Sequence, residues 1–397
     1  MSQMKNKYVN TLLAILFMYA FSLAQTSQTA AVEDFKPSSV TQPGKQYPQV
    51  NSEGRVRTSI TAPQALKVQL DIGAVKYDLT KDTSGVWTGD SKPQDEGFHY
   101  YQVWVDGAAV PDPGSLYFYG ASRWGSGIEI PAKDQDFYSL KNVPHGQIRE
   151  QPYFSKSNTS MRRCFVYTPP DYDKEPTTRY PVLYLQHGGG EDETGWPNQG
   201  KTNLIMDNLI ADGKAKPFII VMDNGAWSMP AQSRPPRPGE RPSGPWPPAG
   251  WTDGFKKTLL EDIIPMIDAN YRTLADQPHR AMAGLSMGGM QTRVITLANP
   301  DLFSYVGIFS GGAIGMNDLT NSPGFKEKVK LVFVSYGSRE LENRRPGGPF
   351  GGDPKATTDS LKEAGINTHF YVSPLTAHEW QSWRRSLHEF AQLVFKN

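Results

Sequence analysis

Cysteine is nearly absent from this chain of 397 residues, in which Cys164 is the only one. A single cysteine excludes an intrachain disulfide, so the fold must be stabilised by packing. Cys164 lies in the strand-like run RRCFVYTPP. We therefore expect a buried, unreactive thiol at this position and not a nucleophile.

The spacings that bind metal ions are also missing. The seven histidines show neither H-x-x-x-H nor H-E-x-x-H spacing, and no second cysteine is present to complete a zinc site. We expect no catalytic metal and no cofactor.

Neither sign of charge is in excess, because 41 Lys and Arg stand against 40 Asp and Glu, for a net charge of +1. Such a chain has no long-range field to attract nucleic acid or an anionic membrane. We expect a neutral partner and no nucleic acid.

A long hydrophobic run occurs only near the start, where Lys5 and Lys7 precede an apolar segment over 8–23. The segment is short for a membrane span and ends in Ser-Leu-Ala before Gln25. This predicts a signal peptide over 1–24, with export to the periplasm or the exterior and no membrane contact in the mature form. An uncleaved anchor is the alternative.

Two segments that differ in their pattern of polar and apolar residues follow. Residues 33–145 alternate polar and apolar positions between Gly, Pro and Asp, which predicts an immunoglobulin-like β-sandwich. The strands expected there are 55–60, 66–72, 74–79, 85–90 and 97–107. Its aromatics Trp104 and Trp124 could stack on sugar rings or pack against the neighbouring domain.

Residues 150–397 alternate apolar runs with helix-length segments, which predicts an α/β fold with a parallel sheet covered on both faces, of the α/β-hydrolase kind. The expected strands are 163–170, 181–188, 217–224, 280–286, 305–311, 331–337 and 369–374. The expected helices are 203–213, 255–272, the segment after Ser286, 356–365 and 379–395.

The segment HRAMAGLSMGGMQT holds a G-x-S-x-G turn between a strand and a helix, formed by Gly284, Ser286 and Gly288. This arrangement is typical of a nucleophile elbow, in which small residues flank a serine held at a sharp turn. We expect Ser286 to be a catalytic nucleophile. The alternative is a structural glycine turn.

A serine nucleophile needs a base, and in α/β-hydrolases the chain order is serine, acid, histidine. His378 lies in the loop SPLTAHEW between the last strand and the last helix, so it is the predicted general base. His369 falls within a strand and His388 within a helix. Core or surface roles suit those two better.

The acid should follow the strand LVFVSY, which selects Glu340 in GSREL. Glu342, Asp353 and Asp359 are competitors.

Three glycines directly after the strand PVLYLQ predict an oxyanion hole formed by the N–H groups of Gly189 and Met287. Asn224, Trp227, Trp251 and Trp380 are predicted to bind substrate. A Pro-rich insert over 230–250 and a Gly-rich insert over 344–354 are either solvated linkers or loops that contact substrate.

The motifs HGGGEDETGW, LEDIIPMIDANYRT and HRAMAGLSMGG together resemble carbohydrate esterase family 1, the esterase D and feruloyl esterase group. The segments GVW, GFHYYQVWVDG and DPGSLYFYG resemble the early-set domain related to family 48 carbohydrate-binding modules. The first resemblance implies a serine esterase that removes hydroxycinnamoyl esters such as ferulate from plant xylan through an acyl-enzyme. It places the roles of nucleophile, acid and base on Ser286, Glu340 and His378, with glutamate where aspartate is usual.

The implied partner is an ester-decorated plant polysaccharide or oligosaccharide. The alternatives are an acetylxylan esterase, a siderophore esterase and a catalytically inactive carbohydrate-binding protein. Because every expected catalytic group follows residue 150, a chain starting near Glu150 is predicted to hydrolyse a small ester, provided that it folds. It should lose efficiency on polymeric xylan if the sandwich positions the polysaccharide. If the sandwich instead covers apolar surface, that shorter chain should aggregate.

Overall fold

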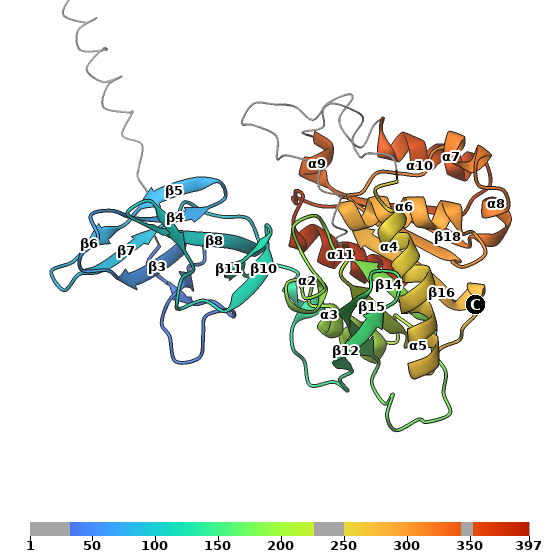
Figure 1. Ribbon diagram of the computed structural model, residues 1–397. Coiled ribbons are helices and arrows are strands. Elements are labelled where there is room, and N and C mark those ends of the chain that lie inside the picture. Colours follow the sequence, from blue (N-terminus) through green and yellow to red (C-terminus); the bar gives the residue numbers. More distant parts are fainter. Residues whose placement is uncertain (1–31, 226–249, 343–351, 397) are drawn as a thin grey trace, which may run out of the picture.

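The computed structural model describes residues 32–225, 250–342 and 352–396 (Figure 1). The predicted signal peptide, Trp227 and nearly all of the two inserts lie outside these residues. Within them, no helix combines the length and the apolar character needed to cross a membrane.

Residues 36–130 form two antiparallel sheets, which we call the N-terminal β unit. The first sheet has the order β1 (Lys36–Pro37), β2 (Gln49–Val50), β3 (Val56–Thr61), β7 (Val86–Asp90) and β6 (Thr80–Lys81). The second has the order β10 (Tyr117–Gly120), β11 (Arg123–Ile130), β8 (Gly97–Val105), β4 (Val68–Ile72) and β5 (Val75–Asp78), with β9 (Ala108–Val110) beside β8. All five strands expected in this region are present.

The two sheets share one hydrophobic core. Alternate residues of β4, namely Val68, Leu70 and Ile72, are buried, as the period of two in a strand requires. They pack in one cluster with Val56 and Trp87 of the first sheet.

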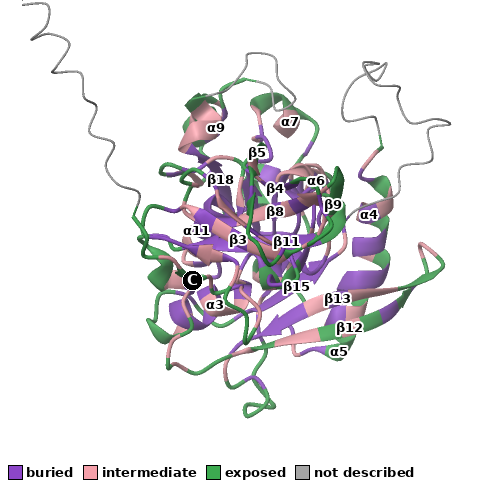
Figure 2. Ribbon diagram, turned by 90° about the vertical axis from the view of Figure 1, so that its left-hand side faces the viewer, coloured by how far each residue is buried: buried purple, intermediate pink, exposed green. Residues whose placement is uncertain are grey.

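The rest of the chain builds one mixed sheet of eight strands (Figure 1). Its order is β12 (Gln147–Ser155), β13 (Ser160–Thr168), β15 (Ile219–Asp223), β14 (Val182–Gln186), β16 (Arg280–Leu285), β17 (Tyr305–Phe309), β18 (Leu331–Gly337) and β19 (Thr368–Ser373). The strands β12 and β13 pair antiparallel, as do β13 and β15, and all other neighbours are parallel. Every residue of β14, β15 and β17 is buried, because helices cover both faces of the sheet (Figure 2).

The helices and 3-10 turns of the described chain connect these strands. They are η1 (Gln135–Tyr138), α2 (Gly195–Asn198), α3 (Thr202–Ala211), α4 (Asp253–Thr258), α5 (Ile264–Asn270), η3 (Gln277–His279), α6 (Met287–Ala298), α7 (Met316–Thr320), α8 (Phe325–Lys328), α9 (Ser338–Glu342), α10 (Pro354–Glu363) and α11 (Trp380–Ala391). Apolar residues of α3 and α11 pack on one face of the sheet, and those of α4 to α6 pack on the other.

The helix expected over 255–272 contains a π-helical turn, η2 (Leu259–Ile263), between α4 and α5. Pro265 follows this turn. Proline has no N–H to donate and its ring collides with the carbonyl four residues earlier, so a wider turn relieves the conflict.

Cys164 lies in β13 as a free thiol with 0% of its surface exposed. Burial raises the pKa of this thiol, which leaves it protonated and unreactive, as predicted.

The N-terminal β unit is packed firmly on the mixed-sheet part. Phe98 and Phe118 belong to the same buried cluster as Leu183 of β14. Arg384 of α11 has no exposed side-chain surface, and it binds both carboxylate oxygens of Glu129 at 2.6 and 2.9 Å. Removal of the unit would expose apolar side chains of the mixed-sheet part and leave a buried cation unpaired, which favours aggregation of a chain starting near Glu150 over its action as a separate enzyme.

Candidate active site

Ser286 stands at the sharp turn between β16 and α6, at the carboxyl edge of the parallel strands. Its torsion angles are φ 51° and ψ −114°, which few residues other than glycine adopt. A Cβ on Gly284 would lie 2.5 Å from the carbonyl of Gly288, and a Cβ on Gly288 would lie 2.5 Å from the carbonyl oxygen of His187. The two glycines are thus required by close backbone approach, which explains the G-x-S-x-G spacing.

The structure brings the predicted nucleophile, base and acid together. His378 Nε2 lies 2.9 Å from Ser286 Oγ, and His378 Nδ1 lies 2.7 Å from Glu340 Oε1. An ionised carboxylate only accepts hydrogen bonds, so Nδ1 carries the proton and Nε2 is left to accept from the serine hydroxyl. This is the arrangement that makes a serine nucleophilic.

Glu340 is held by groups that sequence reasoning missed. Its second oxygen accepts hydrogen bonds from Ser310 Oγ at 2.7 Å and from Gly337 N at 2.8 Å. The indole N–H of Trp383 donates to Ser310 Oγ at 3.2 Å, and the same ring packs edge-on against His378. Only the position of Ser310 directly after the strand β17 could have signalled this role.

The other candidates for the base and the acid lie elsewhere in the fold. His369 stacks on Phe333 inside the sheet, and His388 contacts Glu389 on α11. Asp353 caps the start of α10, and Asp359 pairs with Lys355 on the same helix. Glu342 ends α9 with an exposed side chain.

Residues Gly188–Glu193, which we call the oxyanion loop, leave the sheet beside Ser286. A Cβ on Gly188 would lie 3.4 Å from Ser286 Cβ, whereas Gly189 faces open space. Met287 is the first residue of α6, so its N–H has no partner within the helix. The predicted donors of the oxyanion hole, Gly189 and Met287, thus flank the serine.

His187, before the oxyanion loop, is fully buried, and burial lowers its pKa. Its Nε2 accepts from Gly225 N at 3.1 Å, so Nδ1 is the protonated nitrogen and donates to the carbonyl of Gly188 at 2.7 Å. In a planar trans peptide the carbonyl of Gly188 and the N–H of Gly189 point in opposite directions, so His187 fixes the direction of that donor. No motif or spacing in the sequence indicates this role of His187.

The predicted substrate-binding residues differ in position and in burial. Asn224 directly follows β15, with its amide oxygen 3.3 Å from His187 Nε2. Trp251 is half-buried in the turn before α4. Trp380 does not fit the role, because only 2% of it is exposed and its indole packs against Trp196 and Trp383.

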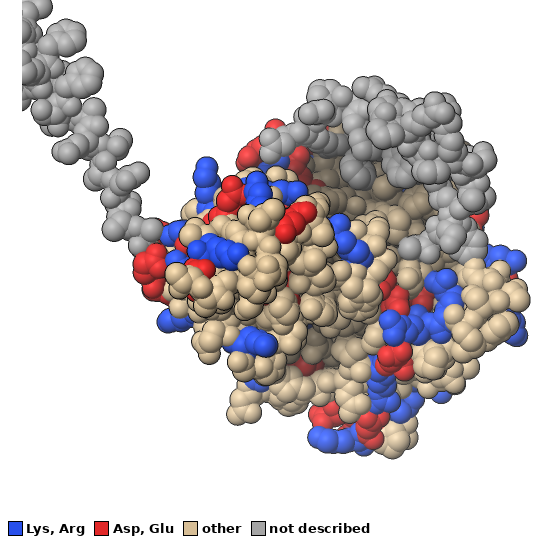
Figure 3. All heavy atoms as spheres, turned by 60° about the vertical axis from the view of Figure 1, so that its left-hand side comes forward, with Lys and Arg blue, Asp and Glu red and all other residues tan. Residues whose placement is uncertain are grey.

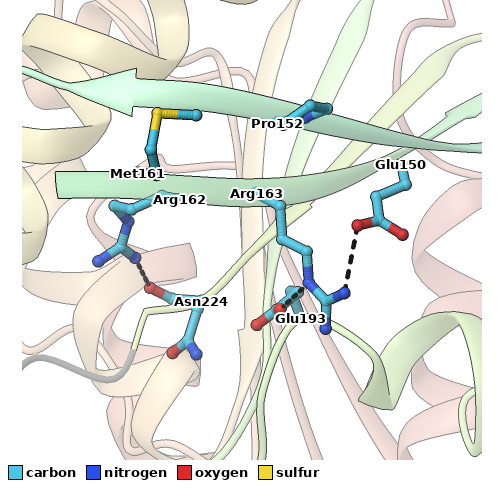
Figure 4. Close-up of a pocket in the computed structure, with 7 residues that line it drawn as sticks. All are labelled: Glu150, Pro152, Met161, Arg162, Arg163, Glu193 and Asn224. Atoms are coloured by element: carbon cyan, nitrogen blue, oxygen red, sulfur yellow. Dashed lines mark hydrogen bonds and ion pairs between the residues drawn. The ribbon is translucent and has the colours of Figure 1, made fainter.

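An open pocket of about 500 Å³ lies beside the oxyanion loop (Figure 4). It is lined by Glu150, Pro152, Met161, Arg162, Arg163, Glu193 and Asn224. Arg163 bridges Glu150 and Glu193 at 3.2 and 2.6 Å, and Arg162 donates to the carbonyl of Asn224. Such planar charged groups can form paired hydrogen bonds with hydroxyls of a bound sugar.

Charges on the surface are mixed in sign. On the face shown in Figure 3, Lys and Arg lie among Asp and Glu over the described residues. Among those same residues, no group of three or more His, Cys, Asp or Glu is placed to hold a metal ion.

The fold is of the α/β-hydrolase type, and a serine, a histidine and a carboxylate in hydrogen-bonded sequence are typical of that class. A protein-family model named Esterase matches residues 155–346. A ferulic acid esterase of carbohydrate esterase family 1 from Anaeromyces mucronatus superposes with a TM-score of 0.52 at 23% identity, over 66% of this chain and 96% of its own. The chain is thus similar in fold to a member of carbohydrate esterase family 1.

A curated relative extends along nearly the whole chain. An endo-1,4-β-xylanase/feruloyl esterase of Xylanibacter ruminicola is 44% identical over 372 residues, which are 92% of this chain and 48% of the relative. The chain thus spans about half the length of that protein, and 23% of an endo-1,4-β-xylanase of Acetivibrio thermocellus.

A second solved structure includes the N-terminal part. The enterochelin esterase of Shigella flexneri has a TM-score of 0.59 at 15% identity, over 87% of this chain and 93% of its own. Residues 147–397 make up less than two thirds of the chain, so this likeness of fold extends into the N-terminal β unit.

Proposed function

We propose that this protein is a serine esterase that removes feruloyl groups from plant xylan. The observation that carries the proposal is the hydrogen-bonded chain from Ser286 through His378 to Glu340, beside a glycine loop. The 44% identity to a xylanase/feruloyl esterase supports the choice of substrate.

In the proposed mechanism, Ser286 Oγ attacks the ester carbonyl carbon while its proton passes to His378 Nε2. The oxyanion receives hydrogen bonds from the N–H groups of Gly189 and Met287, and Glu340 stabilises the imidazolium. Collapse of the intermediate breaks the bond to the sugar oxygen, which takes the proton from His378. Water then attacks the acyl carbon and gives a proton to His378. The bond to Ser286 Oγ breaks, Oγ takes that proton from His378, and the carboxylic acid is released.

The pocket of Figure 4 supports a sugar as the leaving group, because it places Glu150, Arg163 and Glu193 beside the oxyanion loop. We further propose that the N-terminal β unit is an immunoglobulin-like sandwich of the early-set type. Export through a cleaved signal at 1–24 is part of the same proposal, supported by Lys5, Lys7 and the apolar run behind them.

The nucleophile is tested with Ser286→Ala. We expect the rate on p-nitrophenyl acetate to fall by roughly three to six orders of magnitude without a change in the circular dichroism spectrum. A clean variant that keeps more than about a tenth of the rate would rule out Ser286 as nucleophile.

Substrate class is tested by comparing methyl ferulate with acetylated xylan. Faster turnover of methyl ferulate supports the feruloyl esterase, and release of acetate alone favours an acetylxylan esterase. A siderophore esterase, suggested by 32% identity over 171 residues to the ferri-bacillibactin esterase of Bacillus subtilis, would instead cleave ferri-bacillibactin. Absence of hydrolysis in all assays would favour a binding protein.

A further inference from the structure

The N-terminal β unit reaches the oxyanion loop at two points. At the first, the turn between β10 and β11 contacts the loop through its backbone, and Ser122 N donates to the carbonyl of Gly190 at 2.7 Å. Gly190 has φ +78°, and a Cβ there would lie 3.3 Å from Ser122 N. The turn and the loop are thus as close as glycine allows.

The second contact is made by side chains. Glu191 of the oxyanion loop is only 8% exposed, and its carboxylate accepts from Tyr100 Oη–H at 3.3 Å and from Gly188 N at 3.4 Å. Burial raises the pKa of Glu191 to about 7, because the ionised carboxylate is poorly solvated in the interior. The ionised form therefore depends on the hydrogen bonds that it accepts from Tyr100 and Gly188.

The hydrogen bonds around Tyr100 fix the direction of its hydroxyl. Gln199 Nε2 and Trp380 Nε1 both donate to the Tyr100 oxygen, at 2.7 and 3.3 Å. The Tyr100 proton has two acceptors within reach, Glu191 Oε1 at 3.3 Å and the carbonyl of Tyr119 at 3.4 Å. The carbonyl of Tyr119 already accepts from Gln199 at 2.8 Å, and an ionised carboxylate is the stronger acceptor, so donation to Glu191 is favoured.

Glu191 in turn holds Gly188 from both sides of its backbone. The carboxylate accepts from Gly188 N, and the N–H of Glu191 donates to the carbonyl of Gly188 at 3.3 Å. That carbonyl belongs to the same peptide plane as the N–H of Gly189. Without the Glu191 carboxylate, His187 would be the main side chain that orients this peptide plane, so we expect a change at Glu191 to tilt the predicted oxyanion donor.

We propose that Tyr100 and Ser122 of the N-terminal β unit are positioning residues for the oxyanion hole, acting through Glu191 and Gly190. The unit is then part of the catalytic assembly. This inference rests on the oxyanion hole of the proposed function, and it applies to any ester substrate.

Tyr100→Phe tests the proposal, because it removes one hydroxyl and keeps the ring that packs on Phe98. Loss of a whole oxyanion donor costs about a hundredfold or more in kcat, so a tilted donor should cost about tenfold. KM for p-nitrophenyl acetate should stay within about twofold, since the donor acts mainly in the transition state. The Ki of a trifluoromethyl ketone, whose adduct carries an oxyanion, should rise by the factor by which kcat/KM falls.

Two further substitutions make the test more specific. Glu191→Ala should lower kcat at least as much as Tyr100→Phe, and the double variant should lose no more than Glu191→Ala alone. Asp134→Asn weakens a neighbouring contact of α11, the ion pair of Arg385 with Asp134 in the segment that directly follows the N-terminal β unit, and should leave kcat unchanged.

The proposal is overturned if Tyr100→Phe keeps wild-type kcat and Ki, or if Asp134→Asn lowers kcat equally, which would indicate general loosening of the interface. Both variants retain Ser286, so their outcome is separate from that of Ser286→Ala.

Discussion

Ser286 and Ser310 both have left-handed backbone torsions, with φ of 51° and 50°, although neither is glycine. Such a conformation costs about 1–3 kcal/mol and persists only where neighbours enforce it. Here the sheet enforces it, because Ser286 N donates to the carbonyl of Phe309 and Ser310 N to that of Ser335, each at 2.8 Å. The strain lies at the proposed nucleophile and at the residue that holds the proposed acid.

At the same scale, Glu340→Gln should lower kcat by about a hundredfold or more on p-nitrophenyl acetate. The amide keeps the size of the side chain but loses the charge that stabilises protonated His378 and can select the wrong tautomer. The measurement is kcat, taken under conditions in which the variant and the wild-type protein are equally folded.

Glu342→Gln is the matched control, since this side chain is exposed two residues after Glu340 on the same helix, and it should change kcat by less than about twofold. A greater loss of rate in Asp353→Asn or Asp359→Asn than in Glu340→Gln would show that the acid is misassigned.

Among the elements, the end of β18 sets the place of the loop that carries His378. A Cβ on Gly337 would lie 2.3 Å from the carbonyl oxygen of Thr376 and 2.7 Å from that of Ala377. The strand and the histidine loop therefore approach each other at a distance that only glycine permits.

Gly337→Ala should accordingly push the histidine loop away from Glu340. We expect a loss of about 1–3 kcal/mol in the free energy of unfolding and a fall in kcat that exceeds any rise in KM. Gly125→Ala on β11 is the control, because a Cβ there meets nothing within 4 Å. Equal effects of the two substitutions on urea unfolding and on kcat would contradict the role given to Gly337.

For the whole molecule, the ion pair of Glu129 with Arg384 ties the N-terminal β unit to α11. Arg384 is fully buried, with its guanidinium also 4.5 Å from the ring centre of Tyr138. Removal of one partner from a buried pair leaves the other charge unpaired in the interior.

Glu129→Gln should therefore lower the free energy of unfolding by about 3–5 kcal/mol in urea titrations. Asp78→Asn breaks the exposed contact of Asp78 with Lys67 at 3.4 Å and should cost less than about 1 kcal/mol. Similar midpoints for both variants would show that the buried pair does not stabilise the interface.

Local patterns in the sequence determine most of the strands of the mixed sheet and the choice of the candidate catalytic residues. Continuous apolar runs predict β14 to β18, and the order of serine, acid and histidine selects Ser286, Glu340 and His378, because spacing and order are properties of the chain itself. The strand β12 was missed, since it lies at the sheet edge, where polar residues such as Arg149 and Glu150 replace the apolar run.

Only the tertiary structure decided how distant segments meet. The burial of Trp380, the support of Glu340 by Ser310 and the approach of Tyr100 to Glu191 join residues up to 280 positions apart, as in the bond from Trp380 to Tyr100. Periodicity reports which face of an element is apolar, but it does not report which other element covers that face. For the same reason the sequence predicted two separable parts, whereas packing joined them through one core and a buried ion pair.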